Sequence, residues 1–322
     1  MKTDIPHTQI AIIGAGLAGA TFSYFAQQQH IPCLVIEKSR GTGGRAGSKR
    51  LEQGSVDLGA SIISFGDEEL AHLRETLLKA NVIERWQSAY VGVPKMSAIS
   101  RYLLQDTPLL TGNKAHHIER QGKSWLIRDE SYQPICYAEN VILATPALQS
   151  AMLLASIPNS GALLQFANQA GSQTLPQWAM WVTTHATEHA PLVPCQHEVL
   201  ESIIKDSDKP QRPASTTETW VIQASPQWSK KHLDTPKSEV LAEMIHAFSD
   251  VTGVEVLNAG EPHRWLLGRQ VMALAPQPFM WDSTLNVGLI GDWLCQGDAE
   301  GAMLSAKFAF DAIGPTFDMN NL

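Results

Sequence analysis

Two short apolar runs near the start of the chain predict buried strands. Residues 9–13 and residues 33–36 are almost entirely apolar, as in strands that are covered on both faces of a parallel sheet. Between them, residues 17–29 place small and aromatic side chains at helical spacing. A strand, a helix and a strand of this size form a right-handed βαβ unit by default. The opening of the chain therefore predicts an α/β fold with a parallel sheet.

The pattern changes twice after this unit. Asp67 is a suitable N-cap for a helix that continues to about Ala80, with leucines on one face. Tryptophan and proline gather between residues 176 and 281, where Thr235-Pro236 precedes a second amphipathic helix. The remaining predicted elements are short strands at 114–118, 124–128, 134–137, 140–144 and 285–290, and a helix from Gly301 to Ile313.

Composition and charge argue against several classes of protein. The chain has 322 residues, of which 44% are apolar and 17% are charged, so we expect neither a disordered nor a fibrous protein. A net charge of −8 without a basic stripe argues against a nucleic-acid partner. The four cysteines form no CxxC pair, which argues against a disulfide framework and favours a reducing cytoplasm. The apolar stretch at 10–26 is too glycine-rich for a secretory signal or a membrane span. We therefore expect a cytoplasmic protein without membrane contact, as a monomer or a weak dimer.

A glycine-rich motif follows the first predicted strand. Gly14, Gly16 and Gly19 form GxGxxG at the start of the helix, and Glu37 ends the next strand, which is the arrangement that a dinucleotide requires. Gly14 permits the tight turn, Gly16 lets a pyrophosphate approach the backbone, and Gly19 lets the helix pack closely on the strand. The helix N-terminus offers free N–H groups to the phosphates, and Glu37 is placed to accept hydrogen bonds from the adenosine ribose.

Two further segments favour FAD over NAD as the dinucleotide. Gly43-Gly44-Arg45 can bring a guanidinium against pyrophosphate oxygens, while its glycines let the backbone pass under a bulky ring. Asp292 lies just after the last predicted strand, where a carboxylate suits the hydroxyls of a ribityl chain. The helix from Gly301 can direct its positive end at the flavin edge that becomes negative on reduction, although Glu300 opposes this field.

These motifs lie at both ends of the chain, which predicts a discontinuous cofactor domain. We assign residues 1–70, 106–148 and 262–322 to a Rossmann-like, FAD-binding domain with a parallel sheet. Residues 71–105 and 149–261 form an interleaved α+β substrate domain in this scheme. The predicted fold class is therefore mixed α/β.

Taken together, the motifs resemble those of the FAD-dependent amine oxidase superfamily and, within it, the renalase-like branch. The resemblance covers nearly the whole chain and implies a fold of the p-hydroxybenzoate hydroxylase and amine oxidase type. The segments near Trp220 and His263 point to the renalase-like branch, whereas residues 46–48, Ile62 and Leu266-Leu267 depart from it. The matching segments are Gly14 to Gly19, Gly43 to Arg45, Asp57 to Ala60, Met96 to Ala98, Asn140 to Pro146, Lys209-Pro210, Trp220, Trp228-Ser229, His263 to Trp265, Gly291 to Trp293 and Glu300 to Ala302.

The resemblance implies a non-covalent FAD and a set of residues along it. Cys295 lies beside Asp292 rather than in the upstream loop where amine oxidases place a flavin-linked cysteine, so we expect no covalent bond. His116 and His117 point to opposite faces of a predicted strand, so we expect no metal site. The predicted cofactor contacts are Gly14, Gly16, Leu17, Ala18, Gly19, Glu37, Lys38, Gly44, Arg45, Ala60, Ser61, Ile62, Ala115, Asp292, Gly301 and Ala302.

The resemblance also implies a reaction in which a hydride passes from a small organic donor to FAD, and the electrons then pass to oxygen. In the renalase-like branch the donor is a dihydropyridine isomer of NAD(P)H, whose oxidation needs stacking and exclusion of water rather than an acid or a base. We predict His263, Trp220 and Trp178 as catalytic residues, although tryptophans in such a domain are more often core residues. Two alternatives stay open: a flavin amine or polyamine oxidase, and a flavin-binding protein without turnover.

Overall fold

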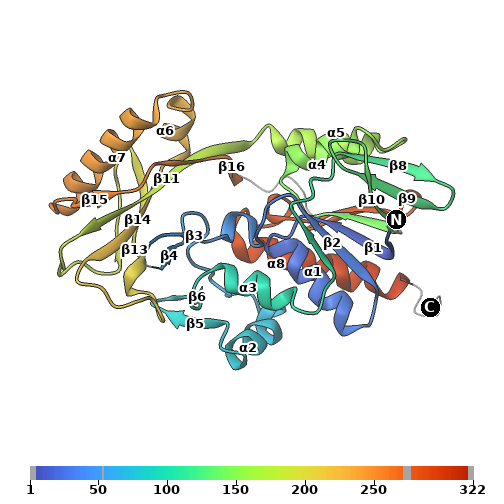
Figure 1. Ribbon diagram of the computed structural model, residues 1–322, viewed down its shortest axis with the longest axis horizontal. Coiled ribbons are helices and arrows are strands. Elements are labelled where there is room, and N and C mark those ends of the chain that lie inside the picture. The colour runs from blue at the N-terminus through green and yellow to red at the C-terminus, as the bar shows by residue number, and fades with distance from the viewer. Residues whose placement is uncertain (1–4, 53, 271–276, 318–322) are drawn as a thin grey trace.

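The computed structural model describes residues 5–52, 54–270 and 277–317. In these residues the chain forms a mainly parallel eight-stranded sheet and a separate six-stranded antiparallel sheet (Figure 1). The predicted mixed α/β fold class is therefore confirmed. No helix in the described residues is both long and apolar enough to cross a membrane.

The eight-stranded sheet is built around the first strand of the chain. Its order is β17-β18-β10-β1-β2-β7, and β1 pairs in parallel with both β2 and β10. The antiparallel strands β8 and β9 extend it beyond β10. The bounds are β1 His7–Ile13, β2 Cys33–Glu37, β7 Leu109–Thr111, β8 His117–Gln121, β9 Ser124–Arg128, β10 Pro134–Leu143, β17 Met280–Asp282 and β18 Val287–Leu289.

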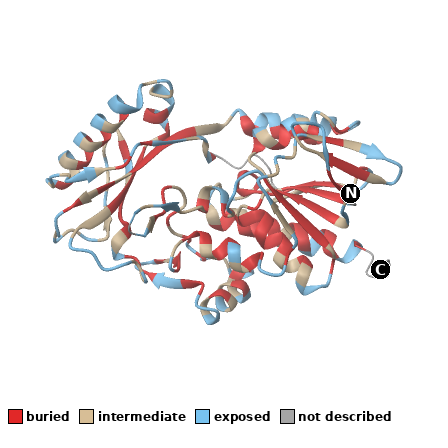
Figure 2. Ribbon diagram, in the orientation of Figure 1, coloured by how far each residue is buried: buried red, intermediate tan, exposed pale blue. Residues whose placement is uncertain are grey.

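Helices cover both faces of this sheet, so its central strands are buried on both sides (Figure 2). On one face, α1 (Leu17–Gln28) and α8 (Ala299–Ile313) pack against each other. On the other face, α4 (Ala147–Leu154) and α5 (Gly161–Gly171) cover the apolar side chains of β10. This double cover explains why the first two strands are continuous apolar runs instead of alternating ones.

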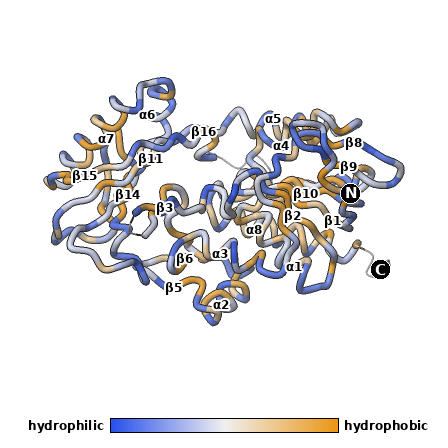
Figure 3. Tube along the Cα trace, in the orientation of Figure 1, coloured by the Kyte–Doolittle hydropathy of each residue, from blue (hydrophilic) through white to orange (hydrophobic). Residues whose placement is uncertain are grey.

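The antiparallel sheet has one face covered by helices α6 (Pro226–Lys231) and α7 (Lys237–Thr252). The apolar stripe of α7 faces the sheet, and its polar side faces outward (Figure 3). The order of the strands is β12-β13-β14-β11-β15, with β16 also paired to β11. The bounds are β11 Thr174–Thr184, β12 Leu192–Val193, β13 Leu200–Lys205, β14 Glu218–Ala224, β15 Asn258–Ala259 and β16 His263–Gln270.

Short elements between residues 49 and 103 lie between the two sheets (Figure 1). Apolar side chains of α2, β5, β6 and α3 belong to the same core as α1 and α8. Val56 and Leu58, in and just after β4, pack instead on the antiparallel sheet. The bounds are β3 Lys49–Arg50, β4 Ser55–Val56, α2 Ala71–Lys79, β5 Ile83–Trp86, β6 Ala89–Gly92 and α3 Ser97–Leu103.

The structure differs from the sequence-based elements and domain boundaries at several places. Residues 263–270 form β16 of the antiparallel sheet, although we assigned them to the cofactor domain, because β16 pairs with β11 over most of its length. Residues 71–104 share the core of the parallel sheet, although we assigned them to the substrate domain. The two strands predicted at 134–137 and 140–144 are one strand, β10, and β8 begins three residues later than predicted.

Candidate functional site

The glycine motif forms a tight turn between β1 and α1. Gly14 has a φ of 109°, and a Cβ there would lie 2.6 Å from the carbonyl oxygen of Ala144, which directly follows the neighbouring strand β10. A Cβ on Gly19 would lie 2.0 Å from the Gly14 carbonyl oxygen, so only glycine lets α1 pack this closely. Gly16 is the N-cap of α1, and no atom lies within 4 Å of where its Cβ would be. Gly16 therefore faces open space, as a phosphate-binding glycine would.

Glu37 lies at the end of β2 and is linked to the glycine turn. One carboxylate oxygen accepts a hydrogen bond of 2.8 Å from the backbone N–H of Ala15, and the other accepts one of 2.8 Å from Ser39. Both oxygens keep a second lone pair. The side chain is thus fixed beside the turn and can still accept further hydrogen bonds.

The second glycine segment lies directly against the first. The backbone N–H of Gly43 donates to the Ala15 carbonyl at 2.8 Å, and a Cβ on Gly44 would be 3.5 Å from the Cα of Gly16. Both Gly43 and Gly44 have positive φ, which glycine adopts without strain. No side chain caps the start of α1, and its first turn carries no acidic residue. This side-chain-free surface at a helix N-terminus fits a dinucleotide pyrophosphate.

Arg45 and Asp292 form a two-point ion pair although 247 positions separate them. Nη1 lies 2.9 Å from Oδ2, and Nη2 lies 2.5 Å from Oδ1. The side chain of Asp292 is 7% exposed and that of Arg45 is 29% exposed, so the guanidinium keeps one accessible side. A guanidinium carries five N–H donors, and this pair leaves some of them for a phosphate. The structure thus unites the two charged groups that we predicted separately for the pyrophosphate and the ribityl chain.

The start of α8 differs from what we predicted for it. The side chain of Asp298 is the N-cap and accepts a 2.7 Å hydrogen bond from Gly301, so that N–H is not free for a flavin. A Cβ on Gly301 would meet the backbone of Gln296, which shows that this glycine faces protein. The buried carboxylate of Glu300 accepts hydrogen bonds from Ser64 and from the Asp67 backbone, the latter at 2.8 Å. Glu300 therefore fixes the 64–67 loop against the start of α8. The neighbouring Ala302 is half-buried.

The predicted contacts Ala60, Ser61 and Ile62 belong to an extended stretch that follows β4. The Ala60 N–H donates to the Arg45 carbonyl at 2.9 Å, and Ser61 Oγ donates to the Asp57 carbonyl at 2.6 Å. Ala60 and Ile62 are half-buried. This stretch therefore runs from the Arg45 loop toward the antiparallel sheet.

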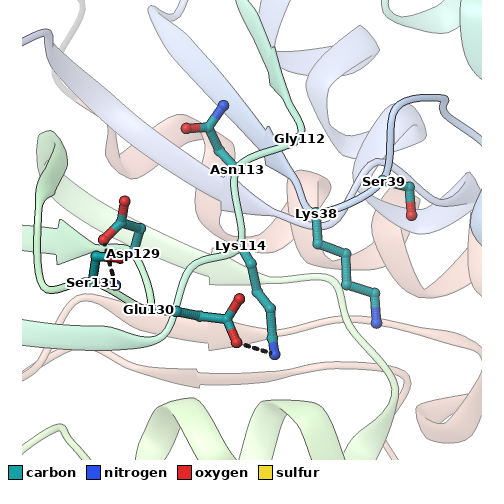
Figure 4. A pocket seen from close by; sticks show the side chains of 8 residues that line it. All are labelled: Lys38, Ser39, Gly112, Asn113, Lys114, Asp129, Glu130 and Ser131. Atoms are coloured by element: carbon teal, nitrogen blue, oxygen red, sulfur yellow. Dashed lines mark hydrogen bonds and ion pairs between the residues drawn. The ribbon is translucent and has the colours of Figure 1, made fainter.

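Lys38 lines an open polar depression at the ends of β2 and β7 (Figure 4). Its volume is about 480 Å³, and the Lys114–Glu130 ion pair of 2.6 Å lies at its rim. Ala115 follows Lys114 directly and is half-buried. The lining residues are Lys38, Ser39, Gly112, Asn113, Lys114, Asp129, Glu130 and Ser131. The depression adjoins Glu37, so it suits the adenosine end of the predicted dinucleotide.

The face of the antiparallel sheet turned away from α7 carries His263 and Trp265. The two rings contact each other edge-to-face at 4.3 Å, and the Trp265 ring approaches within 3.4 Å of where a Gly59 Cβ would be. Partial burial, together with the charges of Lys49 and Lys237, lowers the pKa of His263 below its usual value. This shift favours the neutral form of the imidazole.

Trp178 and Trp220 are not brought to this face. Both are fully buried in the core between the antiparallel sheet and α7. Trp178 Nε1 donates to the His232 carbonyl at 3.1 Å, and Trp220 Nε1 donates to Thr184 Oγ1 at 3.1 Å. Their rings are packed in the core and their indole N–H groups are hydrogen-bonded there, so the prediction that they line the site is wrong.

Two residues of the site were missed in the sequence. Gln223 of β14 donates from Nε2 to the carbonyls of Leu58 and Gly59, at 2.9 and 2.6 Å. Asp298 caps α8, and its position just before the helix could have revealed it. Gln223 carried no such signal, because its partners lie far away in the sequence. The 5–52, 54–270 and 277–317 ranges contain no group of three or more His, Cys, Asp or Glu placed to hold a metal ion.

The chain is similar to known proteins in part of its sequence and in its fold. Residues 12–77 match the NAD(P)-binding Rossmann-like domain family, which spans the glycine turn and Glu37. Putrescine oxidase bound to putrescine has 9% sequence identity with the chain and a TM-score of 0.64, covering 96% of this chain and 99% of that one. Cyclohexylamine oxidase from Brevibacterium oxydans IH-35A has 11% identity and a TM-score of 0.67, covering 97% and 99%. A protein proposed to be a protoporphyrinogen oxidase, from Exiguobacterium sp. 255-15, has 11% identity and a TM-score of 0.63, covering 96% and 99%.

At these identities the likeness is one of fold, and it extends over nearly the whole length of each protein. The parallel sheet, the antiparallel sheet and their connections are all included. The chain therefore has a mixed α/β fold like that of putrescine oxidase and cyclohexylamine oxidase.

Proposed function

We propose that the protein is an FAD-dependent oxidoreductase that binds its flavin non-covalently. The observation that carries this proposal is the junction of the Gly16 turn, the Gly43-Gly44 segment and the Arg45–Asp292 pair. There the Gly43-Gly44 segment lies against the glycine turn, no side chain caps the N-terminus of α1, and Arg45 pairs with Asp292, 247 positions later. That combination suits a pyrophosphate with a sugar on either side.

Each group in the junction has a distinct task in binding. The N–H groups at the start of α1 and the accessible side of Arg45 hold the pyrophosphate. Glu37 accepts hydrogen bonds from the adenosine ribose, and its negative charge disfavours a 2′-phosphate there. Asp292 accepts from the ribityl hydroxyls while its other contacts keep Arg45 in place. FAD supplies, when bound, an acceptor for a hydride and a route for the electrons to oxygen.

The sheet face that carries His263 supports a donor that needs no proton transfer. The lowered pKa of His263 favours its neutral form, Trp265 is aromatic and Gln223 is uncharged, while Lys49 and Lys237 are the charges that act on His263. Glu201 lies near this face but is hydrogen-bonded to Gln177 at 3.0 Å and lies 3.5 Å from Arg269. Such a face can stack a flat, neutral ring and exclude water without acting as an acid or a base. We therefore propose a reduced pyridine nucleotide of the dihydropyridine-isomer type as the donor, as in the renalase-like branch.

A second candidate is oxidation of an amine. The likeness to putrescine oxidase and cyclohexylamine oxidase favours it. In that case the rings of Trp265 and His263 would face a neutral amine. The two candidates share the flavin site and differ only in the donor.

The first experiment is the visible spectrum of the purified full chain before and after denaturation. We expect a flavin spectrum, with all of the flavin released into solution on denaturation and identified as FAD. A colourless protein that does not take up added FAD would refute the proposal. Flavin that stays attached to the unfolded chain would refute the non-covalent binding.

The second experiment identifies the donor by anaerobic mixing. The loaded protein is mixed with isomerised NADH, with freshly prepared NADH, or with putrescine and cyclohexylamine, and bleaching of the flavin is followed. Rapid bleaching by the isomerised preparation alone supports the dihydropyridine donor. Bleaching by amines alone supports the second candidate, and no bleaching by any of them indicates a flavin-binding protein without turnover. Trp265→Phe keeps an aromatic ring at this face and is the matched control for Trp265→Ala, which should slow bleaching.

A further inference from the structure

A buried cluster of four charged side chains connects the two halves of the molecule. Asp57 follows β4, whereas Asp206, Lys209 and Arg212 belong to the loop that connects β13 to β14. All four side chains are at most 3% exposed. The two carboxylates and the two cations balance, so the cluster has no net charge. We call residues 206–213 the clasp.

Asp57 is the centre of this cluster, because one carboxylate collects four donors. Oδ2 accepts from Lys209 Nζ at 3.2 Å and from the Arg212 guanidinium. Oδ1 accepts from Ser48 Oγ at 2.5 Å and from the Met96 backbone at 3.2 Å. Three sequence segments are therefore fixed to a single side chain.

The rest of the cluster anchors the clasp itself. Asp206 accepts from Lys209 Nζ at 2.7 Å and from Arg212 Nε at 3.1 Å. Arg212 also donates to the Pro94 carbonyl, and Trp86 Nε1 donates to Asp208 at 3.1 Å. The clasp thus grips the 48–97 region, which shares a core with the parallel sheet.

Asp57 is also the first residue of the stretch that reaches the candidate flavin site. Its carbonyl accepts from Ser61, and the two residues after it accept from Gln223 of the antiparallel sheet. The Ala60 N–H is bound to the Arg45 carbonyl. A Cβ on Gly59 would lie 1.9 Å from that same carbonyl oxygen, so the stretch has no room to shift along Arg45.

We propose that Asp57, Lys209 and Arg212 are positioning residues that hold segment 57–62 in the register that FAD requires. Docking of the clasp and completion of the flavin site are then one event. A buried ion pair is weak evidence for stability, since apolar residues of similar volume can replace it without loss. It does specify one arrangement, because any other register leaves a charge buried without a partner. This inference rests on the proposed FAD site.

The test separates positioning from stability by a charge-balanced double variant of the full chain. Asp57→Asn alone leaves an excess positive charge in the core and should destabilise the fold. Asp57→Asn combined with Lys209→Met restores neutrality and leaves Arg212 paired with Asp206. We expect this double variant to unfold within about 3 °C of the wild type, while its Kd for FAD rises at least about tenfold. Hydrogen exchange in peptides covering residues 57–62 should become faster without FAD present.

Three further variants keep the test decisive if the double variant does not fold. Asp57→Glu retains the charge but moves the carboxylate by one methylene, so it should weaken FAD binding, whereas Lys209→Arg should retain it. Asp250→Asn removes an exposed ion pair with His246 on α7 and should bind FAD like the wild type. Normal FAD affinity and unchanged hydrogen exchange in Asp57→Glu and in the Asp57→Asn, Lys209→Met double variant would overturn the inference. If the wild type itself binds no FAD, the proposed function fails, while the exchange of segment 57–62 still reports on the positioning role.

Discussion

Gly16→Ala should separate ligand binding from folding at the glycine turn. Gly16 has φ −73° and ψ −175°, a conformation that alanine adopts freely. No atom lies within 4 Å of the added Cβ. The free energy of unfolding of the variant should therefore lie within about 0.5 kcal/mol of the wild-type value, as is usual for a surface substitution that makes no new contact.

The effect on FAD follows from where that methyl group would lie. It would project into open space at the start of α1, which we assign to the pyrophosphate. Forcing one methyl group into a close contact costs about 1–3 kcal/mol. Since about 1.4 kcal/mol is a factor of ten, the Kd for FAD should rise about 5- to 140-fold.

The assay is equilibrium binding of FAD, followed by quenching of its fluorescence, beside thermal unfolding of the apoprotein. Gly41→Ala is the matched control, because nothing lies within 4 Å of a Cβ there either and the residue lies outside the predicted contacts. FAD binding by Gly16→Ala equal to that of the wild type would show that the pyrophosphate does not pass this glycine. If Gly16→Ala lowered the free energy of unfolding as much as it lowered the free energy of FAD binding, the prediction that this methyl group affects binding and not folding would be wrong.

Three further outcomes follow from contacts in the same region and in the core. Gly19→Ala should lower the free energy of unfolding by about 1–3 kcal/mol, because its Cβ would lie 2.0 Å from the Gly14 oxygen; a wild-type melting curve would contradict this. Burial alone would raise the pKa of Asp57, but the Lys209 and Arg212 charges outweigh it and hold that pKa below its usual value. The stability that Asp57 contributes is thus present above its ordinary pKa of about 3.9 and is lost as the pH falls through the lower pKa of the folded state. The urea concentration at the midpoint of unfolding should therefore fall in strong acid. It should fall less in Asp57→Asn, which lacks this carboxylate. Burial raises the pKa of Cys136 to about 12, so mass mapping after iodoacetamide treatment at pH 8 should find Cys136 unmodified in the folded protein and modified in urea.

The sequence predicted the cofactor half of the fold well, because its signals are local. The strand, glycine turn and helix lie within 30 residues, and each glycine has a steric reason that the motif already states. Gly43 meets Ala15 and Arg45 meets Asp292, and all four residues belong to motifs that are visible in the sequence. The interior of the antiparallel sheet was not predictable in the same way. A tryptophan in a strand can face a core or a ligand, and strand register alone decides between them, so Trp178 was placed at the site when it belongs under α7.

Residues that connect distant segments gave no readable sequence signal. Gln223 is an ordinary strand glutamine until β14 is placed beside the 57–62 segment. Lys209 could be noted as part of a motif, but its role needs the position of Asp57, 152 residues earlier. The negative charge of Glu300 opposes the positive field that we expected at the start of α8. Its presence there is explained by the hydrogen bonds that it accepts from Ser64 and from the Asp67 backbone.

The long reach of the Arg45–Asp292 and Glu300–Asp67 contacts bears on how the protein is made. The βαβ unit is synthesised well before α8, yet Arg45 and the 64–67 loop, which follow this unit, have their partners more than 230 positions later. Until that partner segment has been synthesised, the nascent nucleotide surface lacks the acid that orients Arg45, and β10 lacks β18 beside it. Domains generally fold as units during synthesis, so this one is expected to reach its final form late. Under the proposed function, FAD would then be bound chiefly after translation, by a chain whose two distant parts have already met.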